Sequence, residues 1–406
     1  MIPTEATSRI EPCLIGENIP SETSDLVADL VEKSVCLNAG LHSRTAQSLS
    51  SIVRMMNCYY SNLIEGHNTK LQDIERALNS DFEQDAQKRN LQIEALAHIR
   101  VQSKVDQLYA DGILPNPVSM EFIYWLHKEF YLGASEEMLM INSNNQSIVM
   151  QPGKPRSTEK HSVSVGRHEP PSGQNVDEFL QYFENRYSIR MGKSTQIMAI
   201  AAAHHRLAYI HPFLDGNGRV CRLMSHAMGL QAGIGASGLW SISRGLARGI
   251  DEPTEYKRMM DLADMTRQGD LDGRGNLSLK ALISFTNWFL KLSIDQVEFM
   301  STLFDLSNLK KRLDAYVNIK AFKPESQYIL NAVLSNGEVP RGDAERLTGL
   351  KERSARTVLS SLTKDGILAS SSPKGPVSLR FDVESSRLLF PKLFADIPVD
   401  PISPKV

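Results

Sequence analysis

The sequence has few cysteines, no excess of either charge and no long apolar run, and each of these absences excludes a class of protein. The four cysteines are Cys13, Cys36, Cys58 and Cys221. They have no paired spacing, so we expect a reducing compartment and neither a zinc site nor a disulfide framework. The formal net charge of −2 argues against wholesale binding to nucleic acid or to a membrane. No apolar stretch approaches the length that a membrane-spanning helix needs.

Residues Met1–Glu5 lack the basic stretch and the apolar core of a secretion signal, so we expect a cytoplasmic protein. A length of 406 residues suggests roughly two or three domains. The hydrophobic share of 41% and the charged share of 23% are ordinary for a globular chain.

One short segment concentrates reactive side chains. Residues 211–222 read His-Pro-Phe-Leu-Asp-Gly-Asn-Gly-Arg-Val-Cys-Arg. Apolar residues recur at helical spacing over residues 196–210 and again after residue 220, which predicts an amphipathic, buried helix, a tight loop and a second helix. Pro212 and the two glycines break the helical period, and the turn leaves N–H groups pointing outward. Together with the free N–H groups of the second helix, they predict an anion-binding site.

The side chains of this segment suit phosphate chemistry. Arg219 and Arg222 lie one turn apart, off the apolar stripe, and can reach phosphates as planar forks. Asp215 beside a phosphate favours Mg²⁺, and His211 can accept a proton near pH 7. Taken singly, each feature is commonly a helix cap, an ordinary turn or a solvated face. Their joint occurrence at fixed spacing indicates phosphoryl or nucleotidyl transfer.

The segment resembles the signature His-x-Phe-x-Asp/Glu-Gly-Asn-Gly-Arg-x-x-Arg of the Fic family, without a departure. The resemblance implies a mainly α fold, a helical bundle with a small β-hairpin flap. It also implies transfer of AMP from ATP, assisted by Mg²⁺, to a Ser, Thr or Tyr hydroxyl of a target protein and to the chain itself. By carry-over, His211 would be the base, Phe213 the core anchor of the loop, Asp215 the Mg²⁺ ligand, and Gly216, Asn217, Gly218, Arg219 and Arg222 the residues that bind the phosphates.

A second pattern lies in residues 61–66, which read Ser-Asn-Leu-Ile-Glu-Gly. Ser61 and Glu65 share one helix face, and Gly66 is a natural helix end. Taken alone, the pattern is a polar face that ends in a cap. It is also similar to the inhibitory pattern Ser/Thr-x-x-x-Glu-Gly/Asn of the Fic subgroup whose inhibitory helix precedes the core. That resemblance implies that Glu65 pairs with Arg222 in the place of the γ-phosphate, and that Ser61 helps to seat the helix.

Three further interpretations concern the region around this core. The aromatic-rich stretch 117–132 is expected to be core. Short β-like runs at Ser147–Met150 and His161–Val165 suggest strands, and Pro155–Gly166 lies where the family's flap would bind a target by strand addition; a plain surface loop is the alternative. Tyr256 resembles an aromatic residue that lies near the nucleotide in this family, although a tyrosine that packs between helices would look the same.

The C-terminal part predicts three helices and a hairpin. The helices are expected at residues 328–333, 343–347 and 355–362. The two strands of the hairpin are expected at residues 366–368 and 377–381. This order resembles a winged helix-turn-helix. Residues 326–380 hold eight Lys and Arg against five Asp and Glu, a balance of +3 that is mild for a DNA reader. The same fold also serves as a docking or dimer module.

We therefore expect an N-terminal helical region with the inhibitory helix (1–110), a Fic catalytic core (111–310) and a winged-helix domain (318–395). The leading hypothesis is a protein adenylyltransferase that is autoinhibited by Glu65. The alternatives are a de-adenylylating Fic enzyme, or a DNA-binding regulator with a Fic sensor core. The expected partner is a target protein and no membrane. The sequence leaves open whether the chain binds DNA through its C-terminal domain or pairs with a second copy of itself.

Overall fold

The computed structural model describes residues 5–16, 18–37, 40–67, 69–143, 146–235 and 238–393. The chain divides into two compact units. The first takes residues 1–34 and 57–297, and the second takes residues 35–56 and 298–406. Helices α1 (Ser21–Cys36), α2 (Ser43–Ile64) and α12 (Leu279–Phe304) therefore contribute residues to both units. The domain boundaries expected from the sequence stay predictions.

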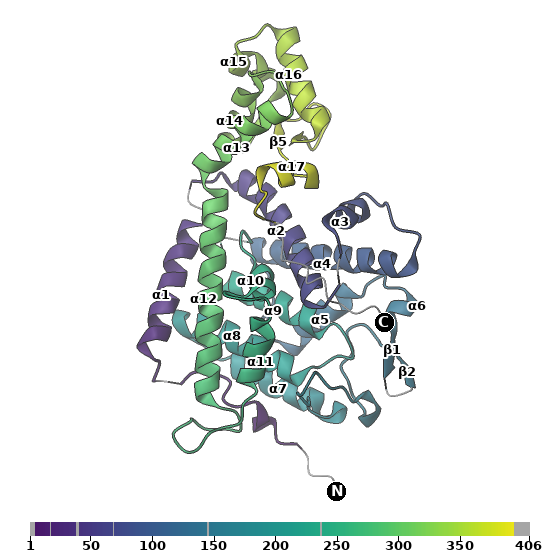
Figure 1. Ribbon diagram of the computed structural model, residues 1–406, viewed down its shortest axis with the longest axis vertical. Helices are drawn as coiled ribbons and strands as arrows, with labels where there is room; N and C mark the ends of the chain where they lie inside the picture. The colour runs from purple at the N-terminus through teal and green to yellow at the C-terminus, as the bar shows by residue number, and fades with distance from the viewer. Residues whose placement is uncertain are drawn as a thin grey trace. The chain divides into compact units, whose positions relative to one another are not determined.

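The first unit is mainly α, as predicted, and Figure 1 shows its helices gathered around α8 (Lys193–Ile210) and α9 (Asn217–Gln231). Its other helices are α3 (Leu71–Leu78), α4 (Ala86–Ala110), α5 (Met120–Phe130), α6 (Glu136–Leu139), α7 (Val176–Tyr187), α10 (Ile242–Arg248) and α11 (Glu255–Ala263). Short 3-10 turns cover Thr7–Ile10, Glu159–His161 and Gly173–Asn175.

Helices α8 and α9 form the centre of this unit. Helix α9 packs against α8, α4, α5 and α10, and α8 also packs against α7. Every residue from Ile197 to Leu207 is buried, so α8 has no exposed face over three turns. The predicted burial of this helix is confirmed, and it extends beyond the apolar stripe, because neighbouring helices cover the polar residues of α8 as well as the apolar ones. The loop between α8 and α9 is thus held at both ends by core helices.

A two-stranded antiparallel hairpin lies beside this bundle. It pairs β1 (Met140–Ser143) with β2 (Gln146–Val149), Met140 opposite Val149. Strand β2 matches one predicted run, whereas the strand predicted at His161–Val165 is wrong. There the His161 carbonyl accepts a hydrogen bond from the Arg156 side chain, and the Ser157 N–H donates one to the His161 side chain. Val165 makes one isolated β-bridge to His168. The hairpin therefore lies earlier in the chain than the predicted flap segment.

The second unit contains the predicted C-terminal helices and hairpin. Its elements are α13 (Leu306–Ile319), α14 (Ser326–Asn336), β3 (Glu338–Val339), α15 (Ala344–Thr348), α16 (Glu352–Asp365), β4 (Leu368–Ala369), β5 (Val377–Leu379) and α17 (Val383–Leu389), with a 3-10 turn at Arg341–Asp343. The antiparallel strands have the order β3-β5-β4. Buried Val333, Val358 and Leu362 form part of the core beneath them. The helix and hairpin positions agree with the sequence, and assignment to the winged-helix class stays a prediction.

The part of α2 up to Met56 belongs to this second unit. Its Thr45 hydroxyl donates to the Leu334 carbonyl over 3.0 Å, and its Ser48 hydroxyl donates to the Leu379 carbonyl over 2.8 Å. These bonds join α2 to α14 and to β5. Across the described ranges of the chain, every helix is too short or too polar to cross a lipid bilayer.

Candidate active site

The candidate site begins where α8 ends. His211 closes the helix in the left-handed conformation, with φ of +49°, and its N–H donates to the Leu207 carbonyl over 3.0 Å. Pro212 cannot continue the helix because it has no N–H. A left-handed residue other than glycine is strained, so the surrounding structure must hold this turn. It places His211 at the junction of helix and loop.

Phe213 and Asn217 close the loop on itself. The Asn217 side chain accepts a hydrogen bond from the Phe213 N–H and donates one to the Phe213 carbonyl, both over 2.8 Å. The Phe213 ring is fully buried, as predicted, and stacks on the His127 ring with the centroids 3.9 Å apart. The Asn217 side chain therefore ties the first residue of α9 back to the loop.

The N-terminus of α9 has no side-chain cap. Gly216 precedes it with φ of +78°, and a Cβ on Gly216 would lie 2.9 Å from the Tyr131 hydroxyl. Conformation and space therefore both require glycine there. The first N–H groups of a helix lack partners within the helix, and the helix dipole makes this end attractive to an anion.

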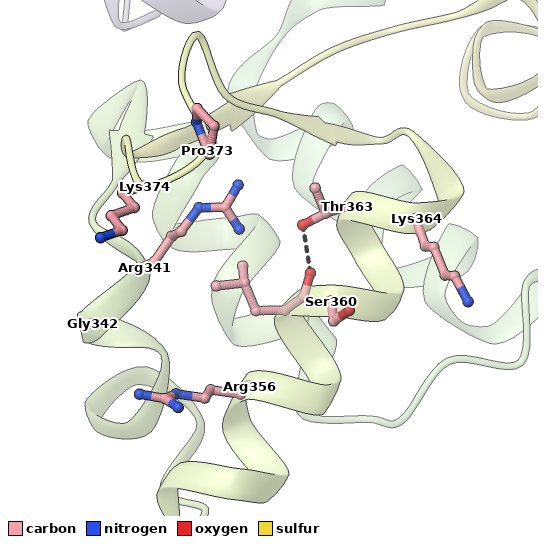
Figure 2. Close-up of a pocket in the computed structure, with 9 residues that line it drawn as sticks. Arg341, Gly342, Arg356, Ser360, Thr363, Lys364, Pro373 and Lys374 are labelled. Carbon is pink, nitrogen blue, oxygen red and sulfur yellow. Dashed lines mark hydrogen bonds between the residues drawn. The ribbon is translucent and has the colours of Figure 1, made fainter.

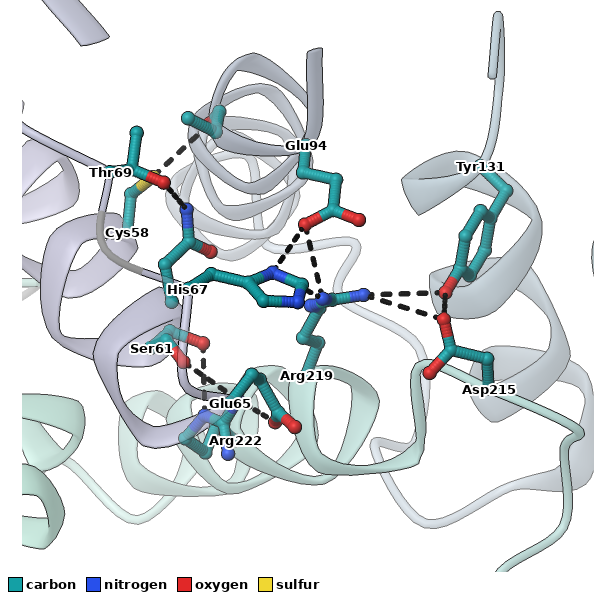
Figure 3. A network of polar contacts seen from close by, with 12 residues as sticks. Cys58, Ser61, Glu65, His67, Thr69, Glu94, Tyr131, Asp215, Arg219 and Arg222 are labelled. Carbon is teal, nitrogen blue, oxygen red and sulfur yellow. Dashed lines mark hydrogen bonds and ion pairs between the residues drawn. The ribbon is translucent and has the colours of Figure 1, made fainter. Parts of the chain in front are cut away.

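The carboxylate of Glu65 occupies this end of α9. Glu65 follows the last residue of α2, and Gly66 then takes a φ of +80°. Its Oε1 accepts a hydrogen bond from Arg222 Nη2 over 2.6 Å, and a Cβ on Gly218 would overlap the same oxygen. Arg222 Nε donates to the Ser61 hydroxyl over 2.9 Å. The structure thus brings together Ser61, Glu65 and Arg222, as the resemblance implied (Figure 3).

Charge keeps Glu65 ionised. Burial raises the pKa of Glu65, but the charges of Arg222 and Arg219 and the hydrogen bond from Arg222 outweigh it, so the pKa lies below its ordinary value. The Glu65 side chain is 31% exposed, whereas that of Arg222 is only 2% exposed. The contact is therefore a charge-assisted hydrogen bond between a partly solvated carboxylate and a buried guanidinium.

Arg219 is held from two sides. Its Nη2 donates to Glu94 Oε2 over 3.1 Å and lies 3.2 Å from His67 Nδ1. Its Nη1 donates to the Tyr131 hydroxyl over 3.3 Å and lies 3.8 Å from Asp215 Oδ2. Figure 3 shows Glu94 on one side of the guanidinium and Tyr131 with Asp215 on the other. Both terminal nitrogens of Arg219 are thus engaged by the protein.

Both arginines of α9 are buried, which their predicted position off the apolar stripe did not indicate. Arg219 and Arg222 are 3% and 2% exposed. Two acidic residues cover them, Glu94 on α4 and Glu65 immediately after α2. The first two turns of α9 are therefore neutralised by carboxylates that lie far away in the sequence.

Asp215 is the acidic residue of the loop, and its side chain is 48% exposed. Its Oδ2 accepts a hydrogen bond from the Tyr131 hydroxyl over 2.8 Å. Burial raises the pKa of Asp215, but the charge of Arg219 and this hydrogen bond outweigh it, so the pKa lies below its ordinary value. No group of three or more His, Cys, Asp or Glu side chains in the described chain could hold a metal by itself. A single ionised carboxylate beside an anion-binding helix end nevertheless fits Mg²⁺, which takes its other ligands from phosphate oxygens and water.

His211 is a neutral imidazole at pH 7. Burial is the largest cause, and the charges of Arg156 and His168 add to it, so that the pKa of His211 falls to about 4. Asp215 acts in the opposite direction but does not offset them. An imidazole that is already unprotonated can accept a proton without first losing one.

Tyr256 lies in the first turn of α11. Its hydroxyl is 2.9 Å from His204 Nε2, and its ring stacks at 6.3 Å from that of Trp288. Burial raises the pKa of Tyr256, and the nearby charge of Arg222 acts against that rise. The tyrosine thus packs between helices near Arg222, and its contact with a nucleotide stays a prediction.

Residues 117–228, which include the loop, match the model of the Fic/DOC family. The chain contains a Fic family domain. Curated relatives carry the name protein adenylyltransferase Fic. That of Drosophila willistoni is 37% identical over 75 residues, 18% of this chain and 15% of the relative. That of Drosophila grimshawi is 39% identical over 72 residues, which again are 18% of this chain and 15% of the relative. The match thus spans about 15% of the length of these relatives.

Solved structures are similar to the chain over much more of its length. A Fic family protein from Desulfovibrio desulfuricans G20 is 16% identical, with a TM-score of 0.50, over 90% of this chain and 98% of that one. Fic-1 from C. elegans is 15% identical, with a TM-score of 0.51, over 70% of this chain and 73% of that one. At these identities the likeness shows the fold, which confirms the predicted Fic-type bundle.

Three residues around the Fic domain's loop were not identified from the sequence as site residues. Glu94 lies outside the matched range, on a helix where it is one of several charged residues without distinctive spacing. Tyr131 belongs to an aromatic-rich stretch whose composition predicts only a place in the core. Arg156 stood in the predicted flap, and its role becomes visible only in three dimensions. In each case the partner lies too far along the chain for local spacing to indicate it.

Proposed function

We propose that the protein is a protein adenylyltransferase that transfers AMP from ATP to a hydroxyl of a target protein and of itself. The observation that carries the proposal is one loop that joins the neutral imidazole of His211 to the uncapped, anion-attracting N-terminus of α9. The names of the curated relatives of the Fic domain support the choice of AMP as the transferred group.

The residues have separate tasks in this reaction. His211 accepts the proton of the acceptor hydroxyl, whose oxygen forms a bond to the α-phosphorus of ATP while the bond to the β-phosphate oxygen breaks and pyrophosphate leaves. The backbone of Gly216, Asn217 and Gly218 binds phosphate oxygens at the start of α9. Arg219 and Arg222 neutralise the β- and γ-phosphates. Asp215 would hold Mg²⁺, which supplies charge neutralisation of the phosphates when bound.

Glu65 regulates this site in the same proposal. Its carboxylate takes the guanidinium of Arg222 and lies against Gly218, where a γ-phosphate would otherwise place negative charge. Two anions cannot share one guanidinium and one helix end without repulsion. ATP therefore binds productively only when Glu65 leaves, and we propose that the described arrangement is an inhibited one.

Position-labelled ATP tests the reaction class. The full chain and its Glu65→Gly variant are incubated with ATP and Mg²⁺, with the label on the α- or the γ-phosphate. Label is expected on protein from α-labelled ATP alone, with a mass gain of one AMP unit. Label from the γ-position would indicate phosphoryl transfer, and no label from either position would reject transfer. Removal of AMP from an already modified protein, without any gain from ATP, would favour the de-adenylylating alternative.

A second candidate function, DNA binding, rests on a basic cavity of the second unit. The cavity measures about 650 Å³ and lies between α16 and the β4–β5 loop. Figure 2 shows Arg341 and Lys374 on one side of it, and Arg356, Ser360 and Thr363 on α16. Of its nine lining residues four are Lys or Arg, and none is acidic.

The geometry of α16 favours a duplex as the ligand of this surface. Basic residues repeat along its exposed face at Arg353, Arg356 and Lys364, a span of about 16 Å at 1.5 Å per residue. Glu352 pairs with Arg356 over 2.6 Å, but both side chains are more than 60% exposed, so the pair is weak. A positive, solvated helix face suits the major groove and its flanking phosphates.

A charge-reversal experiment tests DNA binding. In fluorescence anisotropy with a 25-base-pair duplex, at two salt concentrations, the full chain is expected to bind with a salt-dependent affinity. The double variant Arg356→Glu with Lys364→Glu should bind at least about tenfold more weakly, with a flatter salt dependence. Lys323→Glu, an exposed lysine of the same unit outside the cavity, is the matched control. No binding at low salt, or an equal loss in the control, would contradict the proposal, and binding of an acidic peptide instead would assign the surface to protein docking.

A further inference from the structure

Arg156 is an arginine inside the protein without an acid beside it. It is 2% exposed, and no carboxylate within the described ranges forms an ion pair with it. Burying a charge in this way is costly unless its donors are satisfied by hydrogen bonds. The partners of the Arg156 guanidinium are therefore the feature that explains its position.

These partners are backbone carbonyls, and two of them flank the end of α8. Arg156 Nε donates to the His211 carbonyl over 2.8 Å, and Nη2 donates to the Ile210 carbonyl over 3.2 Å. The backbone N–H of Arg156 donates to the Pro212 carbonyl over 2.8 Å. One residue thus binds three consecutive carbonyls, those of the turn that contains His211.

The remaining donors of Arg156 fix it to the loops on its other side. Nη2 also donates to the Pro171 carbonyl over 2.9 Å, and Nη1 donates to the His161 carbonyl over 3.1 Å. The guanidinium therefore joins the segment 161–171 to the end of α8. A point-like ammonium group could not reach carbonyls in these several directions, whereas the planar fork of arginine can.

We propose that Arg156 is the positioning residue of the catalytic base, because it holds the left-handed turn from which His211 projects. This inference rests on the proposed function, in which His211 accepts the hydroxyl proton. The last carbonyls of a helix lack intrahelical partners, and the C-terminal end of a helix favours a cation. Arg156 supplies both the donors and the charge at the end of α8. It touches no reacting atom in this scheme and acts only through His211.

The charge of Arg156 also acts on the imidazole itself. Burial is the largest cause that lowers the pKa of His211, and the charges of Arg156 and His168 lower it further, whereas the charge of Asp215 and a hydrogen bond with the backbone of Ala208 raise it. Loss of the Arg156 charge should therefore raise the pKa of His211 toward its ordinary value. Arg156 thus has two tasks: its hydrogen bonds hold the turn, and its charge lowers the pKa of His211. The two tasks can be separated by experiment, since a lysine would keep the charge but lose the planar set of donors.

The test uses the full chain with Glu65→Gly, into which Arg156→Gln and Arg156→Lys are introduced. AMP transfer is followed from pH 4 to pH 9, and the titration of the His211 ring is followed by NMR. For Arg156→Gln we expect kcat to fall at least tenfold, KM for ATP to change less than about threefold, and the ring to titrate at higher pH. For Arg156→Lys we expect a similar fall of kcat with the titration little changed.

Arg244→Gln is the matched control, because Arg244 is also a buried arginine, 4% exposed, and it donates to Gln296 over 2.9 Å. It should lower the melting temperature without moving the titration of His211. The inference would be overturned if Arg156→Gln, still folded by circular dichroism, lowered the melting temperature and left both kcat and the His211 titration unchanged. A shifted titration in a protein that transfers no AMP would refute the proposed function and still support the contact between Arg156 and His211.

Discussion

Replacement of Glu65 by glycine is expected to raise AMP incorporation about 10- to 100-fold, since a charge-assisted hydrogen bond of ~1.5–3 kcal/mol no longer competes with ATP. The substitution removes the acid bonded to Arg222 and uncovers Gly218. Because the Glu65 side chain is 31% exposed, solvent screening places the gain toward the lower end of that range. Glycine adds little strain at this position, which already lies beyond the last residue of α2.

Intact-mass analysis after incubation with ATP and Mg²⁺ measures this gain. Glu65→Gln keeps the shape of the side chain and removes its charge, so an intermediate rate would show that charge as well as bulk blocks the site. Ser61→Ala removes the hydrogen bond to Arg222 Nε and leaves the acid in place, and it should release the enzyme less than Glu65→Gly does. Equal ATP use by Glu65→Gly and the parent chain would refute autoinhibition.

The pH dependence of inhibition follows from the pKa of Glu65. Burial raises this pKa, but the effects that lower it are larger in sum, and the charge of Arg222 is the first among them. The pKa therefore lies below its ordinary value. The pair is therefore fully formed above the ordinary carboxyl pKa of 4.5 and is lost only as the pH falls through the lowered value. The ratio of the Glu65→Gly rate to the parent rate should thus stay constant between pH 6 and pH 9.

The sequence predicts well those parts of the site whose residues stand together. The loop from His211 to Arg222 is contiguous, so its chemistry and its helix–loop–helix setting follow from spacing. Glu65 and Arg222 are 157 residues apart, and no periodicity relates them. Their pairing could be inferred only because two separate patterns resemble one family.

The contacts that sequence reasoning did not find are those between a side chain and a distant backbone or buried partner. The partners of Arg156 are backbone carbonyls, which every residue has. The residue types at the partner positions therefore do not indicate the contact. Glu94 faces Arg219 from α4, and its position depends on how α4 packs against α9. The prediction of a strand at His161–Val165 is wrong for a related reason. The alternation of Ser and Val does not reveal that the Arg156 side chain donates a hydrogen bond to the His161 carbonyl.

Substitution of His211 by alanine is expected to lower kcat for AMP transfer about 10²–10⁴-fold, the usual contribution of a general base. The fall should appear in the Glu65→Gly chain, where the starting rate is high enough to measure. Phosphate binding uses the backbone of α9 and its arginines instead of the imidazole, so ATP affinity should change less than about threefold. His42→Ala, an exposed histidine of the second unit, serves as the control for loss of a histidine.

The pH profile of the unsubstituted base distinguishes this role from a structural one. With the pKa of His211 lowered to about 4 by burial and by the charges of Arg156 and His168, the imidazole is unprotonated above that value. In kcat/KM, which reports the free enzyme, the acid limb should therefore lie near pH 4 and not near pH 6.5. An acid limb near pH 6.5 would mean that the imidazole is solvated and that the turn at the end of α8 opens before ATP binds. Unchanged transfer by His211→Ala would remove the base from the mechanism, because no other imidazole stands on the loop between α8 and α9.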